Sequence, residues 1–263
     1  MMPRAFILLL CFSAVAAAAG DAATQPATAP AGDQAVLQAA GDALSGMQGA
    51  DSGSLLKAVA AITVLSVAPA ILVMVTSFTR VVVVLGLLRQ ALATQQTPPN
   101  QVLFGLALLI TVAVMAPVYQ DVHRDAIGPY MAGEADAATA VRAGEGHVRA
   151  FMIRQIEAGG NADDVYLFLK EDLAAREDLA WKDVPTTALI PAFVVSELKI
   201  AFLMGFRVFL PFVIIDMLVG SVLVSMGMLM LPPSMISLPF KLLLFVLADG
   251  WRLVVGTLLT SFG

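Results

Sequence analysis

The amino-acid sequence predicts an all-α membrane protein built from helical hairpins, and three observations lead to this prediction. Of the 263 residues, 59% are hydrophobic and only 13% are charged, whereas soluble domains carry roughly 25% charged residues. The mean hydropathy is +0.86. The apolar residues also gather into long uncharged runs, such as 58–79 and 101–119, which are long enough for helices to cross a bilayer. The net charge of −5 offers no electrostatic basis for binding nucleic acid.

Residues 1–19 have the features of a secretory signal peptide that is cleaved. Arg4 supplies the positive charge, residues 5–15 form an apolar core, and the alanines that follow suit a cleavage site. The core is too short to span a bilayer as an anchor. Cys11 is the only cysteine and would leave with the signal. We therefore expect a mature chain without a disulfide, a thiolate nucleophile or a cysteine metal site.

The charge pattern divides the rest of the chain. Arg80 and Arg89 lie in a stretch without acidic residues, which the positive-inside rule places facing the cytoplasm. The acidic middle of the chain is then periplasmic, in a multi-pass protein of the bacterial inner membrane. The predicted parts are a flexible linker at 20–54, a first hydrophobic hairpin at 55–119, a polar and mainly helical periplasmic segment at 120–183, and a second hydrophobic hairpin at 184–263 with a Met-rich loop at 225–235.

Four charged residues interrupt the second hydrophobic hairpin. Each costs about 2.5–3.5 kcal/mol at the centre of a membrane helix. None lies three or four positions from an opposite charge among the four, so they cannot pair with one another along one helix. We expect partners on other helices or other subunits, which makes the four residues candidate ion pairs of assembly. Roles in lining or gating a passage are a second reading, and a direct proton or ion relay is the least favoured. They are Glu197, Lys199, Arg207 and Asp216.

Nearer the C-terminus, Asp249 and Arg252 are three residues apart in an apolar stretch. This spacing places two side chains on the same face of a helix. We therefore expect these two residues to pair with each other.

Residues 225–235 read SMGMLMLPPSM. The two consecutive prolines disfavour helix before them, which indicates a loop between two apolar helices. Met226, Met228 and Met230 alternate along the chain and would project from one side of an extended loop. Flexible thioether side chains either fill irregular gaps in a core or line a deformable constriction. Both readings stay open on these residues alone.

Motifs of known enzyme classes are absent from the sequence. His123 and His147 lie in the polar segment, and no HExxH, GxSxG, Walker lysine or GxGxxG motif occurs. The sequence therefore predicts a protein that is not an enzyme, with no catalytic residue, no metal site and no cofactor. A membrane enzyme has almost no support. A small-solute transporter or ion channel subunit is the main alternative, because charges and prolines interrupt the apolar stretches.

Two long stretches and one short one resemble a known family. They read TSFTRVVVVLGLLRQALATQQTPPNQVLFGLALLIT, SELKIAFLMGFRVFLPFVIIDMLVGSVLVSMGMLMLPPSMISLPFKLLLFVLADGWRLVVG and VRAFMIRQ. They are similar to the flagellar branch of the FliP/SctR family of type III secretion export-gate proteins. The resemblance covers about residues 55–263 and departs from the usual pattern at the linker and at EAGGNADDVYLFLK, which is longer and more acidic.

The resemblance implies a fold, a function and partners. Family members form the core of the flagellar export gate at the basal body, as a ring of about five copies with FliQ and FliR, in an apparatus that includes FlhA and FlhB. Unfolded flagellar subunits pass through the centre of this ring to cross the inner membrane. Met-rich loops close the passage as a gasket, for which the matching residues here are Met226, Met228 and Met230. The hairpins are expected to form a helical cone raised largely out of the bilayer plane, where charged side chains are tolerated.

Overall fold

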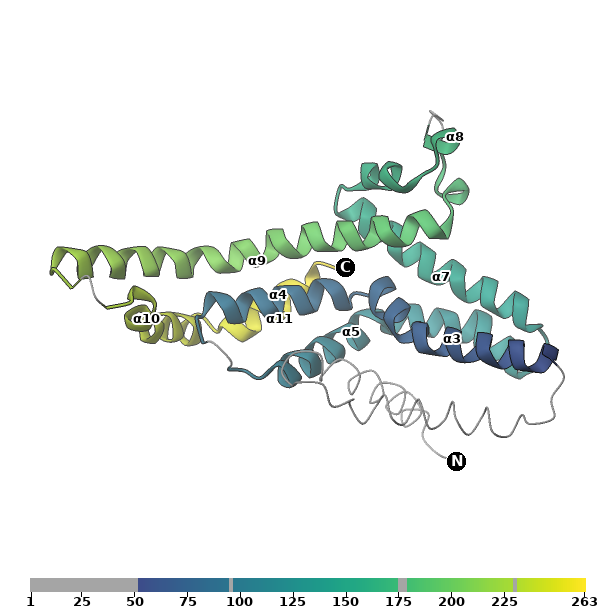
Figure 1. The fold of residues 1–263 in the computed structure, drawn as a ribbon, viewed down its shortest axis with the longest axis horizontal. Coiled ribbons are helices and arrows are strands. Elements are labelled where there is room, and N and C mark those ends of the chain that lie inside the picture. Colours follow the sequence, from purple (N-terminus) through teal and green to yellow (C-terminus); the bar gives the residue numbers. More distant parts are fainter. Residues whose placement is uncertain (1–51, 95–96, 175–178, 229–230) are drawn as a thin grey trace. The chain divides into compact units, whose positions relative to one another are not determined.

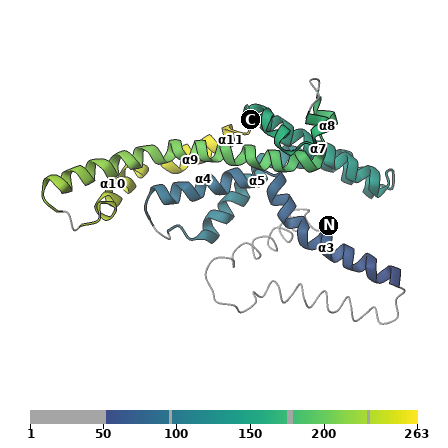
Figure 2. The same ribbon diagram turned by 45° about the horizontal axis from the view of Figure 1, so that its top comes forward.

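The computed structural model describes residues 52–94, 97–174, 179–228 and 231–263. Within these ranges the chain forms helices joined by turns, without a strand (Figure 1; Figure 2), so the all-α prediction is confirmed. Two separate units are present, Met1–Leu72 and Val73–Gly263. The predicted signal peptide and nearly all of the predicted linker lie outside the described residues.

Helix α3 (Ser52–Val75) begins the described chain and belongs mostly to the first unit. Its hydroxyl groups are satisfied within the helix. The Thr63 hydroxyl donates to the carbonyl of Val59 at 2.8 Å, and the Ser66 hydroxyl donates to that of Ile62 at 2.7 Å. A hydroxyl group that is hydrogen-bonded within its own helix is compatible with an apolar environment. Transfer of an unpaired hydroxyl into such an environment costs free energy.

The second unit begins with a helical hairpin. Helix α4 (Phe78–Ala91) ends before the TPPN stretch, and α5 (Asn100–Val122) starts directly after Pro99. Proline disfavours helix at the residue before it, so these prolines separate two helices. Helix α5 continues through a π-helical turn (His123–Ile127) into α6 (Gly128–Met131).

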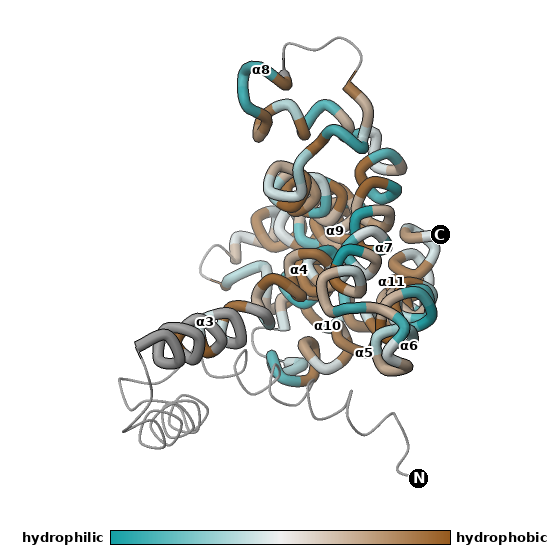
Figure 3. Tube along the Cα trace, turned by 90° about the vertical axis from the view of Figure 1, so that its right-hand side faces the viewer, coloured by the Kyte–Doolittle hydropathy of each residue, from teal (hydrophilic) through white to brown (hydrophobic). Residues whose placement is uncertain are grey.

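The polar segment contains one long helix and several short ones. Helix α7 (Ala137–Ala158) is capped by Asp136, whose side chain accepts the backbone N–H of Thr139 at 3.2 Å. Hydrogen bonding to the side chain and then the backbone of Thr139 lowers the pKa of the Asp136 carboxyl, which favours the charged cap. Hydrophilic residues gather around α8 (Figure 3). The short elements are η2 (Ala162–Phe168), α8 (Glu171–Ala174) and η3 (Trp181–Asp183).

Helix α9 (Thr186–Ser225) is 40 residues long, which corresponds to about 60 Å and exceeds the roughly 30 Å hydrocarbon core of a bilayer. It contacts α4, α7, η2 and α10, and α4 runs beside its central part (Figure 1). Among the described residues, the combined helix Asn100–Met131 and α9 are long and apolar enough to cross a membrane. Counting each of two bent helix pairs as one span gives up to four candidate spans.

The last apolar stretch is not one continuous helix. It consists of α10 (Pro233–Leu247) and α11 (Gly250–Thr260), which meet at an angle of 62°. The break lies at Asp249, which has a left-handed backbone with φ 50°. Gly250 is required beside it, because a Cβ at this position would overlap the ring of Phe245. Asp249 is the N-cap of α11 and lacks the helical backbone angles that the expected pairing requires. No Asp249–Arg252 ion pair occurs within the described residues.

Two hydrophobic clusters hold the second unit together. One joins α4, α5, α9, α10 and α11, and the other joins α5, α7 and α9. The first cluster requires a close approach of α4 to α9 at Gly205. A Cβ at this position would overlap Cδ1 of Leu87 and would lie 3.1 Å from its Cβ and 3.2 Å from its Cγ. The whole Leu87 side chain, not only its tip, limits the size of the residue at 205.

We therefore expect Gly205→Ala to lower the stability of the second unit. Overpacking costs about 1–3 kcal/mol, which exceeds the gain of about 1 kcal/mol in helix propensity. Gly86→Ala on α4 is the matched control, because no atom lies within 4 Å of its Cβ position and only the propensity gain applies. Thermal unfolding in detergent checks both variants; an equal or raised Tm for Gly205→Ala would contradict this packing.

Candidate functional site

Arg80 on α4 is the centre of a buried polar cluster in which its five N–H groups all have acceptors. Nε donates to Glu197 Oε2 at 2.8 Å, and Nη2 donates to Glu197 Oε1 at 2.5 Å and to Gln155 Oε1 at 3.1 Å. Nη1 donates to the carbonyl oxygen of Ser261 at 2.9 Å and to its hydroxyl at 3.1 Å. The ring of Phe262 lies 3.9 Å from the guanidinium carbon. This cluster joins α4, α7, α9 and the end of α11.

The Arg80–Glu197 pair is removed from solvent, with side chains 1% and 0% exposed. Arg80 is therefore not an exposed base, because its guanidinium is neutralised inside the protein and brings no charge to a surface; the side of the membrane on which it lies stays a prediction. Arg89 lies nine residues further along α4, on the opposite face of the helix. It is half-buried and donates to the side-chain oxygen of Asn100. The side of the membrane that Arg89 faces stays a prediction.

A second polar cluster joins α9 to α10. Lys241 is buried and donates to Asp216 Oδ2 at 2.6 Å and to the carbonyl of Ala91 at 3.1 Å. The Ser237 hydroxyl donates to Asp216 Oδ1 at 2.5 Å. Because Ala91 is the last residue of α4, the ammonium group also satisfies a carbonyl at a helix C-terminus, where positive charge is favourable. Lys241 was missed in the sequence analysis, although a lone lysine in an apolar stretch is a signal for a buried partner.

The other two charges on α9 have different surroundings. Lys199 donates to Asp164 on η2 at 2.5 Å, with more than half of the lysine side chain exposed. Arg207 is exposed and forms no ion pair within the described part of the chain. Three of the four predicted residues thus pair with other elements of the same chain. A role for any of the four in assembly between subunits stays a prediction.

The turn after α9 carries the methionines. The N–H of Gly227 donates to the carbonyl of Val224 at 3.0 Å, and that of Met228 donates to Leu223 at 2.9 Å, the bond pattern of a Schellman motif. Gly227 has φ 76°, which suits a residue without a Cβ. The predicted extended conformation is therefore wrong here, because Met226 keeps helical angles.

Met226 and Met228 are 67% and 40% exposed, so neither fills a gap in the core of the chain. Met230 lies outside the described residues. Apolar exposure continues over the second half of α9 and over α10, and exceeds the scattered apolar residues that are normal on a soluble surface. The exposed large apolar residues of these two helices include Met217, Leu218, Val222, Val224, Met235, Phe240, Leu243, Val246 and Leu247.

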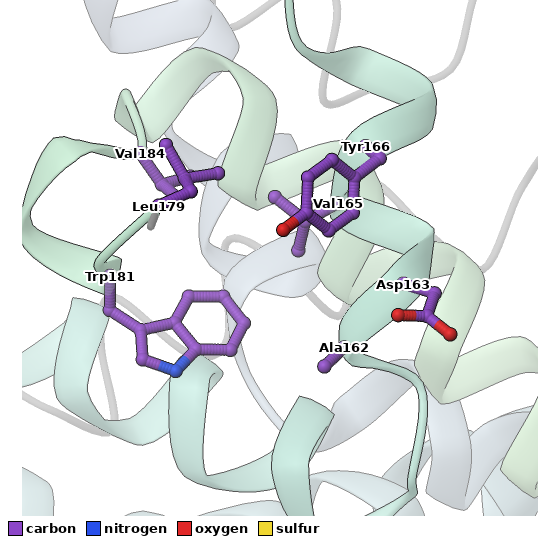
Figure 4. A pocket seen from close by; sticks show the side chains of 7 residues that line it. All are labelled: Ala162, Asp163, Val165, Tyr166, Leu179, Trp181 and Val184. Carbon is purple, nitrogen blue, oxygen red and sulfur yellow. The ribbon is translucent and has the colours of Figure 1, made fainter. Parts of the chain in front are cut away.

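A small pocket lies in the polar segment, between η2 and η3 (Figure 4). It has a volume of about 200 Å³ and is lined mainly by Tyr166, Val165, Trp181 and Val184. The Trp181 indole N–H donates to Glu157 at 2.6 Å, so its polar group is already satisfied. No group of three or more His, Cys, Asp or Glu side chains suited to a metal occurs within the described ranges.

Comparisons with known proteins identify the family. Residues 61–258 match the profile of the FliP family. Similar proteins include the flagellar biosynthetic protein FliP of Bacillus subtilis (strain 168), 48% identical over 80% of this chain and 92% of the relative. The proteins of the same name from Caulobacter vibrioides and Pectobacterium carotovorum are 50% and 49% identical over 76% of this chain, and 73% and 76% of their own lengths are covered. The chain belongs to the FliP family of flagellar biosynthetic proteins and is a component of the flagellar export apparatus.

Proposed function

We propose that the chain is a core subunit of the flagellar type III export gate, where several copies form the channel that passes unfolded flagellar subunits across the inner membrane. One observation carries the proposal: Met226 and Met228 are exposed at the end of α9, on a turn fixed by a Schellman motif. The turn belongs to an uncharged run from 217 to 240. In a ring of copies, such turns can meet at a common axis.

The chemistry of the turn suits a seal that opens for a polypeptide. A passage for unfolded chains must accept side chains of many shapes and still exclude ions. Thioether side chains are unbranched and adaptable, so a ring of them can close on itself and yield to a passing chain. A hydrophobic constriction of this kind excludes ions by dewetting. A charged ring would attract ions, and a ring of β-branched side chains would fit fewer shapes.

The exposed apolar faces of α9 and α10 support an assembled state. They fit contact with other copies, with the FliQ and FliR subunits implied by the family, and with lipid at the inner membrane. FlhA and FlhB are the expected neighbours in the wider apparatus. This role is structural, with no catalytic residue and no cofactor. The ring size of about five copies and the periplasmic position of part of the chain belong to the same proposal.

A small-solute transporter remains the alternative function to be tested. Such a protein usually presents polar groups to a solute near the bilayer midplane. The buried charges here are instead occupied, because Glu197 binds Arg80 and Asp216 binds Lys241. This arrangement favours structural pairing over a solute site.

Native mass spectrometry of the chain co-expressed with FliQ and FliR distinguishes the two functions. The gate proposal predicts a hetero-oligomer with several copies of this chain and bound partner subunits. Cells that lack the chain should also fail to export flagellar subunits. A chain that remains a monomer or dimer without these partners, and that is dispensable for export, would contradict the proposal.

A further inference from the structure

Arg207 lies on an exposed apolar stripe of α9. Leu203, Leu210 and Ile214 are exposed large apolar residues, and their spacing from 207 places them on the same helix face. Arg207 is exposed on this stripe and has no acidic partner in the part of the chain that the structure describes. A cation on an apolar face is costly unless an anion reaches it.

A complementary acid lies on another surface of the same unit. Asp249 is exposed at the break between α10 and α11, and it too forms no ion pair within the described residues. The exposed apolar side chains of Val246, Leu247 and Leu253 flank it. Each surface therefore carries a charge in an apolar setting, and the two charges are opposite.

The two charges lie at the same level along α9. Helices α9 and α10 run antiparallel, because Asp216 pairs with Lys241 and Phe212 packs on Phe245 with ring centroids 6.5 Å apart. These two contacts are one helical turn apart on both helices. One further turn beyond Phe245 reaches Asp249, and one further turn back from Phe212 reaches position 208 of α9. Asp249 and Arg207 therefore lie at nearly the same height along α9.

The two charges face different directions within one chain. Arg207 is nine residues from Asp216, which is about 180° around a helix, and five from Phe212, which is about 140°. Both of those residues face α10, so Arg207 points away from α10 and from the break that follows it. An intrachain pair is therefore disfavoured, whereas a neighbouring copy at the same height can supply the carboxylate.

We propose that Arg207 of one copy pairs with Asp249 of the next copy, where the apolar stripe of α9 packs against the α10–α11 break. This inference rests on the proposed assembly of several copies and names the contact that joins them. The contact uses two different surfaces, so it is heterologous and generates a ring if the rotation closes. The charges then satisfy each other in a setting that excludes water, and they set the register of neighbouring copies.

Cross-linking in membranes tests the contact. A Cys11→Ser background removes the only cysteine of the chain. Arg207→Cys and Asp249→Cys are introduced singly and together. A short bis-maleimide is the cross-linker, because the Cα atoms of two residues that pair through long side chains can be further apart than the roughly 4.4–6.8 Å that a disulfide requires. The double variant should give a ladder of cross-linked multimers. Each single variant expressed alone should give only monomers. The two single variants expressed together should give only dimers. Absence of the ladder, or dimers from one single variant, would overturn the proposal.

Charge exchange gives a second measurement that does not depend on cysteine. Arg207→Glu should lower the oligomer fraction about tenfold, an effect typical of a close interfacial charge pair, and Asp249→Lys in the same chain should restore most of it. Asp249→Asn should weaken assembly without straining the turn, since asparagine tolerates a left-handed backbone. Arg252→Gln, one turn along α11, is the control and should assemble normally. Normal assembly of Arg207→Glu would contradict the proposed contact. Absence of rescue by Asp249→Lys would also contradict it, and is the result expected if Arg207 binds a phospholipid headgroup instead.

Flagellar export measured in the same cells separates this contact from the gate function. A chain that is required for export but gives neither a ladder nor charge rescue contradicts only the Arg207–Asp249 contact. A chain that is dispensable for export contradicts the proposed function itself.

Discussion

Glu197→Ala is expected to prevent stable folding of the second unit. The substitution leaves Arg80 charged and buried, with its remaining hydrogen bonds to Gln155 and Ser261. Breaking a buried pair by removing one partner costs about 3–5 kcal/mol, a large share of the 5–15 kcal/mol that stabilises a typical protein. The level of the chain in membranes and its resistance to protease should both fall.

The control is an ion-pair cluster on the surface of the same unit. Arg124→Ala removes pairs with Asp121 and Asp125 in which all three side chains are at least 40% exposed, and exposed pairs contribute little to stability. This variant should accumulate as the wild type does. Replacing both Arg80 and Glu197 with leucine should recover part of the stability, because no unpaired charge remains. If Glu197→Ala leaves the chain intact and lowers only the oligomer, the role of Glu197 lies between subunits, as the sequence alone suggested.

Replacing Met226, Met228 and Met230 together with alanine should make the inner membrane leak small ions. Met226 and Met228 are exposed on the turn and make up no part of either core cluster, so the variant should still fold and assemble. Alanine is too short to reach across the axis of a ring, and a gap would remain there. Conductance or dye uptake in cells, compared at equal oligomer levels, measures the effect.

A leucine triple variant at the same positions separates apolar closure from compliance. Leucine preserves apolar surface but is branched and less adaptable than methionine. We expect this variant to keep the membrane tight while export slows. If the alanine variant assembles fully and its membranes stay as tight as the wild type, the methionines do not seal a passage.

The sequence predicted the helices well where a strong local signal marks them. The prolines before Asn100 and the uncharged run at 101–119 mark α5, because chain breakers and apolar length act locally. The pairing of Arg80 was not predictable in this way. Its partner is 117 residues away, and a count of loop charges cannot distinguish a surface arginine from a buried one.

Two turns also differed from expectation for local reasons. Alternation suggested that the methionines lie on an extended loop, yet Gly227 supplies the positive φ that ends α9 in a Schellman turn. The break at Asp249 was missed, although the Asp-Gly pair in ADGW is a local turn signal. The close packing of Gly250 on Phe245 at this break is revealed only by the folded structure.

Photo-crosslinking of an export substrate arrested in the gate tests the channel function most directly. A flagellar subunit fused to a stably folded domain should stall during export, and a photoreactive residue replaces either Met228 or Val141, an exposed residue of α7 in the polar segment. If the turn lines the passage, the stalled chain should form an adduct with position 228 and little or none with position 141. A stalled substrate that forms no adduct at 228, or equal adducts at both positions, would contradict a passage closed by this turn.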